Sequence, residues 1–397
     1  MDALTTPSNW QRVRLGDIAE IIGGGTPGTQ ITSFWNGSIN WFTPTEMGIT
    51  KYVYKSQRTI TPLGLKKSSA KLLPIGTILL TSRASIGDCA ILKVVATTNQ
   101  GFQSLIPLEK INNEFLYYLM LTLKNKLLKL ASGSTFLEVS PNKIKNLLIP
   151  LPPLNEQIAI ANILSDVDHY LYSLDALILK KESIKKALSF ELLSQRKRLK
   201  GFNQNWQRVR LGDICEFGNG GAYETLIVEN GDFKLISLNS IDIDGNLKNT
   251  MKRVNFYDNS LKQDDIVMVL SDVAHGDFLG LCAVIPSNDY VLNQRMGRLR
   301  KKNDCINILF LRLYINANQK YFKMQGQGSS QLNLSKKAIE DFEILLPSLN
   351  EQAAIANILS ALDNEIISLK NKKRQFENIK KALNHDLMSA KIRVLKK

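Results

Sequence analysis

The sequence predicts an α+β protein in which two globular α/β domains are joined by two long antiparallel helices that form a coiled coil. Three observations support this prediction: a duplicated helix-forming segment, a duplicated nonapeptide, and mixed strand and helix signals between the copies. The duplication gives the chain a pseudo-twofold internal repeat. We divide the 397 residues into a first globular domain at 1–150, a central helix at 151–200, a second globular domain at 201–345 and a distal helix at 346–397.

Two stretches of the sequence occur twice. LPPLNEQIAIANILS at 151–165 returns as LPSLNEQAAIANILS at 346–360 with 13 of 15 positions identical. WQRVRLGDI at 10–18 returns unchanged at 206–214. The offsets, 346 − 151 = 195 and 206 − 10 = 196, are nearly equal, so one ancestral unit of a globular part and a helix is written twice.

The central segment has the pattern of a long amphipathic helix. A proline pair leads into Asn155, which we expect as the N-cap, and Glu156 suits the positive end of the helix dipole. Apolar residues then recur in alternating steps of four and three, the seam of a coiled coil. Basic residues before Gly201 indicate an end there, so we expect a helix from Asn155 to Lys200, about 70 Å long if unbroken. The seam comprises Ile160, Leu164, Val167, Leu171, Leu174 and Ile178, and Leu188 and Leu192 rejoin it after two lysines.

The distal segment repeats the cap and the seam, with Asn350 as the expected N-cap and Glu351 in the first turn. Two equivalent units related by a twofold axis bring equivalent helices together antiparallel where they cross that axis. We therefore expect a chain that resembles a fused dimer, with its globular domains at opposite ends of a helical rod. The repeated seam comprises Ile355, Leu359, Leu362, Ile366, Leu369, Phe376, Leu383 and Leu387.

Each globular domain combines short strand-like runs with one amphipathic helix. Runs rich in β-branched and apolar residues lie between glycine, proline and asparagine, as is typical of strands. The predicted strands are 77–80, 89–95, 265–270 and 281–285, and the predicted helices are Glu114–Leu130 and Ile306–Met324.

The composition fits a soluble protein of the cytoplasm. Hydrophobic residues make up 44% of the chain, enough for packed cores. The start has no basic segment followed by an apolar one, and no apolar run is long enough to cross a bilayer, so we expect no membrane association. The four cysteines and three histidines lie far apart without a CxxC pair, which predicts buried free thiols and no metal site.

The charge of the chain indicates a polyanionic partner. The formal net charge is +15, and the two globular domains share it unequally. Residues 1–150 carry 16 basic and 8 acidic side chains, whereas residues 201–345 carry 17 of each, so the domains differ by eight charges. We infer that they share an architecture and have diverged at the surface.

Motifs for catalysis are lacking in the sequence. GGGTPG at 23–28 formally matches the GxGxxG dinucleotide pattern, but Pro27 and the residues after it do not open the helix that this motif needs. A glycine-rich turn is the better interpretation. Asp264 and Asp265 are a candidate acid pair, although a solvated turn is more typical of such neighbours. There is no Walker loop, HExxH or GxSxG, so we expect no catalytic residues.

Residues suited to DNA contacts occur in both globular domains. The first mixes lysines and aromatic residues, which suit phosphates and groove edges, and has an arginine after a strand, where it could read guanine. The second offers amides that could pair with adenine. A solvated polar face is the alternative for each residue. The candidates are Trp41, Lys51, Tyr54, Lys66, Lys67, Arg83, Asn293, Arg295, Gln327 and Gln331.

The arrangement resembles the specificity subunit of type I restriction-modification systems. The similarity lies in LPPLNEQ and LPSLNEQ at the helix starts, in RLGDI before each domain, and in GGTP at 24–27 followed by Phe34, Trp35 and Trp41. It covers the whole chain. The second domain departs from it, with GNGGAY in place of GGTP.

The resemblance implies that the globular parts are target-recognition domains, each reading one half of a bipartite double-stranded DNA target. It also implies two methylation subunits and a restriction subunit as partners, with S-adenosylmethionine, ATP and Mg bound to those partners and none in this chain. The repeated triplets at the helix starts are the candidate partner interface: Asn155, Glu156, Gln157, Asn350, Glu351 and Gln352.

Two other functions stay open at this point. One is a coiled-coil DNA-binding or adaptor protein without a methyltransferase partner, which the neutral second domain favours. The other is an enzyme, a nuclease or a methyltransferase, whose site is too dispersed to recognise in the sequence.

Overall fold

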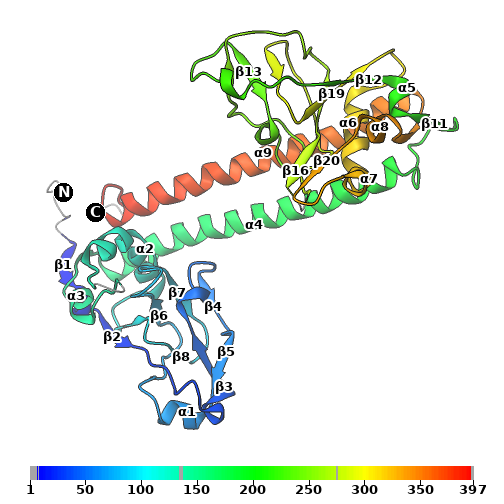
Figure 1. Ribbon diagram of the computed structural model, residues 1–397. Coiled ribbons are helices and arrows are strands. Elements are labelled where there is room, and N and C mark those ends of the chain that lie inside the picture. The colour runs from blue at the N-terminus through cyan, green and yellow to red at the C-terminus, as the bar shows by residue number, and fades with distance from the viewer. Residues whose placement is uncertain (1–6, 8, 134–136, 274–275, 395–397) are drawn as a thin grey trace. The chain divides into compact units, whose positions relative to one another are not determined.

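The computed structural model describes residue 7 and residues 9–133, 137–273 and 276–394 of the chain. These residues form two compact units (Figure 1). The first unit holds the described residues up to Ala176 and those from Asn371 onward, and the second is Leu177–Lys370. Each unit contains one globular domain and half of each long helix, α4 (Leu154–Leu193) and α9 (Leu349–Met388). None of the helices in the described ranges combines the length and the hydrophobicity that a membrane span requires.

The globular domain of the first unit is built on three sheets. The largest has the strand order β2 (Ala19–Gly23), β9 (Gln103–Pro107), β6 (Ile78–Leu80), β7 (Cys89–Leu92) and β4 (Tyr52–Val53). The second has the order β5 (Arg58–Ile60), β3 (Trp35–Phe42) and β8 (Ala96–Thr98), and the third pairs β1 (Gln11–Arg14) with β10 (Leu148–Leu151). Its helices are η1 (Leu15–Asp17), η2 (Thr32–Phe34), η3 (Pro44–Glu46), α1 (Pro62–Lys66), α2 (Asn113–Leu130) and α3 (Pro141–Lys145).

Among the described residues, the second unit repeats the strand order of these three sheets, except that its largest sheet has four strands and lacks a counterpart of β4. The largest sheet has the order β12 (Cys215–Asn219), β19 (Met296–Lys301), β15 (Ile266–Val269) and β17 (Cys282–Val284). The second has the order β14 (Arg253–Val254), β13 (Phe233–Ile236) and β18 (Tyr290–Leu292). The third pairs β11 (Gln207–Arg210) with β21 (Glu343–Leu346). The unit adds the pair β16 (Ser271–Val273) and β20 (Gln331–Asn333). Its helices are α5 (Leu211–Ile214), η4 (Glu224–Leu226), η5 (Leu238–Ser240), α6 (Ile308–Ala317), α7 (Gln319–Gln325) and α8 (Lys336–Glu340).

Within the first unit, the α4 half and the α9 half run antiparallel. Asp168 pairs with Lys380 and Asp175 pairs with Lys373 at 2.6 Å between Oδ1 and Nζ, so partner numbers fall along α9 as they rise along α4. The residues of the predicted seam that are buried in this unit are Ile160, Leu164, Leu174 and Leu387.

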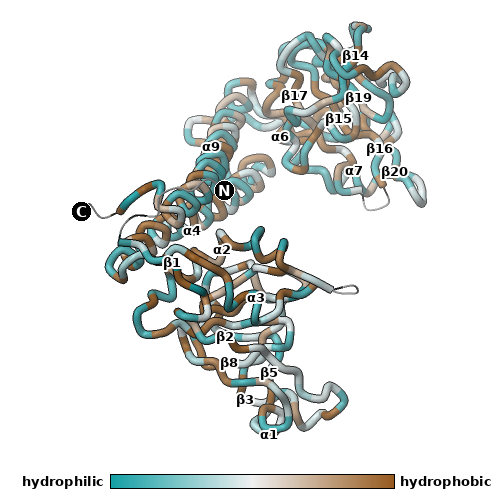
Figure 2. The backbone as a smooth tube through the Cα atoms, turned by 90° about the vertical axis from the view of Figure 1, so that its left-hand side faces the viewer, coloured by the Kyte–Doolittle hydropathy of each residue, from teal (hydrophilic) through white to brown (hydrophobic). Residues whose placement is uncertain are grey.

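Within the second unit, the pairing has the same direction. Glu182 pairs with Lys370 at 2.8 Å between Oε1 and Nζ, and Lys185 pairs with Asp363. Hydrophobic and hydrophilic residues alternate along both helices (Figure 2), as the duplicated seam requires. The predicted antiparallel coiled coil is therefore confirmed in each unit.

Both long helices differ from their predicted ends. They begin at Leu154 and Leu349, one residue before the expected N-caps. The first ends at Leu193 and not at Lys200, because Gln195 adopts a left-handed φ of 64° and turns the chain away. Ala390, 195 residues later, has φ 57° after α9. The two helices thus end in the same way, and the predicted cap at Gly201 is wrong.

The amphipathic helix predicted in each globular domain is present, but the second copy is broken. The first is α2, which begins one residue before the predicted start. The predicted helix 306–324 is instead α6 and α7, separated at Asn318. The Asn318 Nδ2 group donates to the Tyr314 carbonyl at 2.8 Å, and this local bond interrupts the helix.

The cysteines are free, and three of the four are buried, as predicted. Burial raises the pKa of the Cys89 and Cys215 thiols to about 12, so both stay protonated near neutral pH. Cys282 is also buried, whereas Cys305 is exposed and does not fit the prediction.

Candidate nucleic-acid interface

A buried glutamate anchors the start of α4 in the first unit. The Glu156 carboxylate accepts hydrogen bonds from the Trp10 indole Nε1 at 3.0 Å and from the Arg393 guanidinium Nε at 2.9 Å. Trp10 opens the repeated nonapeptide and Arg393 follows α9, so three distant segments meet on one carboxylate. A buried charge needs such a cation and such donors, because it has lost its hydration.

The second unit contains the same anchor. The Glu351 carboxylate accepts from Trp206 Nε1 at 3.1 Å and from Arg198 Nε and Nη2 at 3.1 and 2.7 Å. Arg198 lies after the turn that ends α4, as Arg393 lies after the turn that ends α9. The duplicated motifs therefore build one structural joint twice.

A buried glutamine follows each anchor. The Gln157 amide donates to the carbonyl five residues earlier at 3.0 Å, and its oxygen accepts from the backbone N–H of Asn112, the N-cap of α2, at 3.0 Å. Gln352 makes the same two bonds at 2.9 and 2.8 Å, the second with Asn307, the N-cap of α6. Each glutamine thus ties the start of a long helix to its own globular domain.

The repeated triplets do not present the surface that we predicted for a partner interface. Asn155 and Asn350 are exposed and stay candidates for such an interface. The other four side chains are almost completely buried with partners inside their own unit, so they hold the fold. These four are Glu156, Gln157, Glu351 and Gln352.

The glycine-rich segment of the first domain is a tightly packed turn. A Cβ atom on Gly24 would lie 2.0 Å from the Asn99 carbonyl oxygen, and one on Gly25 would lie 2.4 Å from the Ala70 nitrogen, so only glycine fits. The Trp41 indole Nε1 donates to the Gly25 carbonyl at 2.8 Å. Trp41 is buried in this role and does not face a ligand, contrary to the prediction.

The second domain keeps this close approach despite its different sequence. A Cβ atom on Gly220 would lie 2.1 Å from the Asn293 carbonyl oxygen. The Asn293 side chain accepts from the Tyr223 backbone N–H at 3.1 Å and donates to Glu224 at 2.7 Å. Asn293 is 1% exposed, so it supports the turn and is not the DNA contact that we predicted.

Lys51 is held where the first domain meets α4. Its Nζ contacts the Tyr118 hydroxyl at 2.8 Å and the Ser165 hydroxyl at 2.7 Å, and it pairs with Glu114. Burial raises the pKa of Tyr118, and its hydrogen bond to Asp168 raises the pKa further, so the phenol stays neutral. Lys51 therefore joins a domain to a helix, and the prediction of a DNA contact fails because its charge is already compensated.

An exposed basic surface lies on the part of the first domain formed by β3, β5, α1 and the adjoining loops. The Arg58 guanidinium stacks on the Trp35 ring at 3.8 Å from its centroid, and Tyr54 is exposed nearby in sequence. Among the described residues, none of its five cations has an acidic partner within 4.0 Å, so all are free to bind phosphates. We call Lys55, Arg58, Lys66, Lys67 and Lys71 the basic surface.

Arg83 forms a half-exposed ion pair with Glu138 in the first domain. The two residues face each other in an antiparallel bridge, with 2.8 Å between Arg83 Nη2 and Glu138 Oε2. The backbone beside them is fixed, because the Ser82 N–H donates to the Gly101 carbonyl at 2.8 Å and the Val139 N–H donates to the Ser82 carbonyl at 3.1 Å. We call Arg83 and Glu138 the first polar pair.

Ser271 and Asn333 form a neutral pair in the second domain. They are direct partners in the β16–β20 register, and the Ser271 hydroxyl donates to the Asn333 side-chain oxygen. The Leu270 N–H donates to the Arg295 carbonyl at 3.0 Å, and the Leu334 N–H donates to the Leu270 carbonyl at 2.8 Å. We call Ser271 and Asn333 the second polar pair.

The two polar pairs occupy equivalent positions. The two backbone hydrogen bonds of Ser82 in the first domain correspond to the two backbone hydrogen bonds of Leu270 in the second. Glu138 and Asn333 are 195 residues apart, which is the offset of the repeated helices. Three predicted residues surround the second pair: Arg295 beside it, Gln327 bonded to the Asn333 backbone, and Gln331, whose Nε2 donates to the Ser271 hydroxyl at 2.8 Å. The sequence interpretation missed Glu138, Ser271 and Asn333. The 195-residue offset relates Glu138 to Asn333, whereas Ser271 lies 271 − 83 = 188 residues after Arg83 and is related to it only through the strand pairing.

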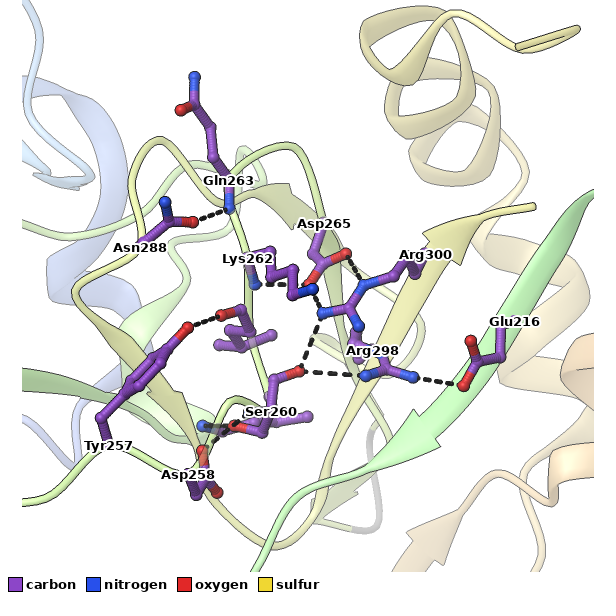
Figure 3. Close-up of polar contacts among 12 residues, drawn as sticks. Glu216, Tyr257, Asp258, Ser260, Lys262, Gln263, Asp265, Asn288, Arg298 and Arg300 are labelled. Carbon is purple, nitrogen blue, oxygen red and sulfur yellow. Dashed lines mark hydrogen bonds and ion pairs between the residues drawn. The ribbon is translucent and has the colours of Figure 1, made fainter. Parts of the chain in front are cut away.

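One of the two adjacent acids of the second domain, Asp265, has a structural role. The Asp265 carboxylate accepts from Arg300 Nε at 2.8 Å and Nη2 at 2.6 Å and from the Lys262 N–H at 2.7 Å (Figure 3). Asp265 is buried, so the expected solvated turn is wrong for this residue. Its hydrogen bonds raise the pKa of Arg300. Beside it, Arg298 Nη2 donates to Glu216 at 2.7 Å.

Comparison with known proteins places this geometry in one family. The model of the type I restriction modification DNA specificity domain matches residues 7–183 and again residues 203–378. The MjaIX type I specificity subunit of Methanocaldococcus jannaschii is 34% identical over 58% of this chain and 57% of its own length. The MjaVIII specificity subunit of the same organism is 28% identical over 99% of this chain and 95% of its own length.

A solved structure has the same fold. The S subunit of a type I restriction-modification system from M. genitalium aligns with a TM-score of 0.62 at 20% sequence identity, over 97% of both chains. At this identity the likeness supports the fold alone, and it agrees with the double match of the family model.

Proposed function

This chain belongs to the type I restriction modification DNA specificity family, and we propose that its two target-recognition domains each read one half of a bipartite DNA target. The observation that carries the proposal is the duplication of the whole site. Apart from the extra strand β4 of the first unit, the two units have the same strand order, the same glutamate anchor and a polar pair at the same position, while the side chains of the pair differ. A common scaffold with exchanged surface groups is suited to reading two different sequences.

The proposed partners follow from the same duplication. Two equivalent units offer two equivalent docking faces, which suits two methylation subunits, with a restriction subunit as a further partner. S-adenosylmethionine, ATP and Mg would bind to those partners, and this chain would contribute specificity without a reaction of its own. Asn155 and Asn350, exposed at the two helix starts, are the remaining candidates from the repeated triplets for that interface.

The decisive experiment is a binding measurement with the full chain and its methylation subunit. We expect a preference for one bipartite sequence that persists as salt rises, because base contacts lose less affinity with salt than phosphate contacts do. Equal affinity for all DNA sequences at every salt concentration would refute the proposal. Cleavage or methyl transfer by this chain alone would instead establish an enzyme, and protein binding without DNA binding would establish an adaptor.

The long helices offer a second test, because we propose that they set the distance between the half-sites. Inserting one heptad into α4 and a matching heptad into α9 adds about 10 Å of helix to each and preserves the seam. The expected result is a longer spacer with unchanged bases in each half, measured by selecting targets from a library with variable spacers. An unchanged spacer would contradict the role of the helices.

A further inference from the structure

We propose that the two polar pairs are base-reading positions: Arg83 with Glu138 reads a G·C pair in one half-site, and Asn333, held by the buried Ser271 hydroxyl, reads the adenine of an A·T pair in the other. This inference rests on the proposed function and deepens it, because it names the residues and the bases. It derives from the structural equivalence of the two pairs and from the different chemistry that the two domains place there.

The first pair carries the groups that a G·C pair presents in the major groove. An arginine fork donates to O6 and N7 of guanine, and a carboxylate accepts from N4 of cytosine. Arg83 and Glu138 already lie in contact at 2.8 Å, so a single base pair can meet both. Their side chains are 42% and 32% exposed, so exchanging their contact for a base does not uncover a buried charge.

The second pair carries the groups that suit adenine. An asparagine amide donates to N7 and accepts from N6 of adenine. The Asn333 side chain is exposed, and its present bonds are to the Ser271 hydroxyl and, at 3.3 Å, to the Gln331 carbonyl. Both are bonds between neutral groups, which an adenine edge can replace at little cost. Gln331 Nε2 already donates to the Ser271 hydroxyl oxygen at 2.8 Å, so Ser271 keeps this partner when Asn333 turns to a base.

Both pairs combine a fixed backbone with an exchangeable side chain. Ser82 and its counterpart Leu270 each donate and accept a backbone bond directly before the reading position, and the opposite strand is held across the bridge. A rigid backbone keeps the side chains in place, which lowers the ordering cost of binding. Trp41, Lys51 and Asn293 lack this combination, because their polar groups are buried and compensated.

The test exchanges the two pairs reciprocally in the full chain. R83S/E138N gives the first domain the second pair, and S271R/N333E gives the second domain the first pair. Each variant, with the methylation subunit, selects its target from DNA with both half-sites randomised. We expect R83S/E138N to change a G·C position to A·T in one half only and S271R/N333E to change an A·T position to G·C in the other, each with a shift in preference of about 10-fold to 100-fold.

Two controls make every outcome informative. R208S/E343N applies the same chemical change to the exposed ion pair between β11 and β21, and it should leave both half-sites unchanged. R83K keeps the charge but removes the fork, and it should weaken the guanine preference, because an ammonium can reach O6 and N7 only without the fixed geometry of the guanidinium, while its affinity for non-specific DNA stays within about twofold. If an exchange variant does not fold, R83K decides the first pair, and N333D, which removes the amide donor that adenine N7 needs, decides the second by losing the adenine preference.

Three results have distinct meanings. Unchanged half-sites in the folded exchange variants and in R83K would overturn the assignment of the polar pairs, although the proposed function would stand. Changes in both halves from one exchange would also overturn it, because each pair belongs to one domain. A wild-type chain that selects no sequence would refute the proposed function itself.

Discussion

The two globular domains share a scaffold but use charge in opposite ways. The first carries an excess of eight basic residues, and its basic surface is exposed without acidic partners among the described residues. The second carries equal numbers of basic and acidic residues, and many of its cations are paired inside the domain. These pairs are Lys234–Asp289, Lys252–Glu224, Arg298–Glu216, Arg300–Asp265 and Lys323–Asp277.

The difference teaches that the fold does not depend on surface electrostatics. Paired charges stabilise a domain weakly and attract phosphates weakly, whereas unpaired lysines neutralise phosphates and release counterions. We therefore expect the first domain to supply most of the salt-dependent affinity for DNA and the second to depend on base contacts.

The domains also differ where they meet the long helices. In the first unit Lys51 lies at the junction and contacts the hydroxyl groups of Tyr118 and Ser165. In the second unit the residue 195 positions after Tyr118 is Leu313, which lines a cavity of about 900 Å³ together with Phe190 and Ile367. The duplicated anchors thus hold each domain on its helices, while the packing beside them is free to vary.

The largest effect should come from removing the shared anchors. E156A and E351A each leave an arginine and an indole N–H without their carboxylate, and breaking a buried pair costs about 3 kcal/mol of stability. Regional hydrogen exchange should show faster exchange at the start of α4 in E156A and at the start of α9 in E351A. If only one of the two variants lost stability at its helix start, the two anchors would not be equivalent.

The matched control for the anchors is E343A. Glu343 forms an exposed pair with Arg208, so its removal should change stability by less than about 0.5 kcal/mol. An effect as large as that of E351A would mean that burial does not set the strength of these contacts.

The next largest effect should come from the two close-packed glycines. G24A and G220A place a methyl group 2.0 and 2.1 Å from a carbonyl oxygen, which forces the backbone apart at a cost of about 1–3 kcal/mol in each domain. Thermal unfolding of the two variants should show similar losses. G23A is the control, because its Cβ would have no neighbour nearer than 3.6 Å. A loss in G24A alone would mean that the GNGGAY turn does not need its glycine.

The long helices could be predicted from the sequence, whereas the roles of several polar side chains could not. The repeated motifs and the heptad seam predicted the helices and their direction, because the spacing of apolar residues within a short stretch of sequence indicates which face of a helix is buried. The internal roles of Lys51, Trp41 and Asn293 were not predictable, because each side chain bonds to groups far away in the sequence, as Lys51 does to Ser165. Polar residue type indicates what a side chain can bind, and only the fold decides whether its partner is internal.

A smaller effect should separate the charge patterns of the two domains. Replacing the four lysines of the basic surface by glutamine should lower the slope of log affinity against log salt by about 0.9 for each lysine that binds a phosphate. Replacing four paired lysines of the second domain by glutamine removes the same charge, but it should change the slope by less than the amount expected for one phosphate-binding lysine, about 0.9. Equal changes of the salt slope in the two variants would contradict the expectation that the first domain supplies most of the salt-dependent affinity. The control lysines are Lys234, Lys252, Lys301 and Lys323.

The smallest effect should appear inside the coiled coil, where one layer differs between the units. Tyr170 packs on Phe376 in the first unit with ring centroids 4.6 Å apart, and the equivalent layer of the second unit is an ion pair between Lys181 and Glu365 at 2.8 Å. Aromatic pairs contribute about 0.5–1.5 kcal/mol and do not respond to salt, whereas partly exposed ion pairs contribute about 0–1 kcal/mol and are screened.

Transplanting the aromatic layer with K181F/E365Y should therefore raise the stability of the second unit by less than about 1 kcal/mol and reduce its dependence on salt. Regional hydrogen exchange at low and high salt measures both changes. K181E alone should destabilise the layer, because it places two carboxylates together, and K181E/E365K should restore it. If K181E has no effect at low salt, this layer does not help to align the two helices, and the apolar seam alone sets their register.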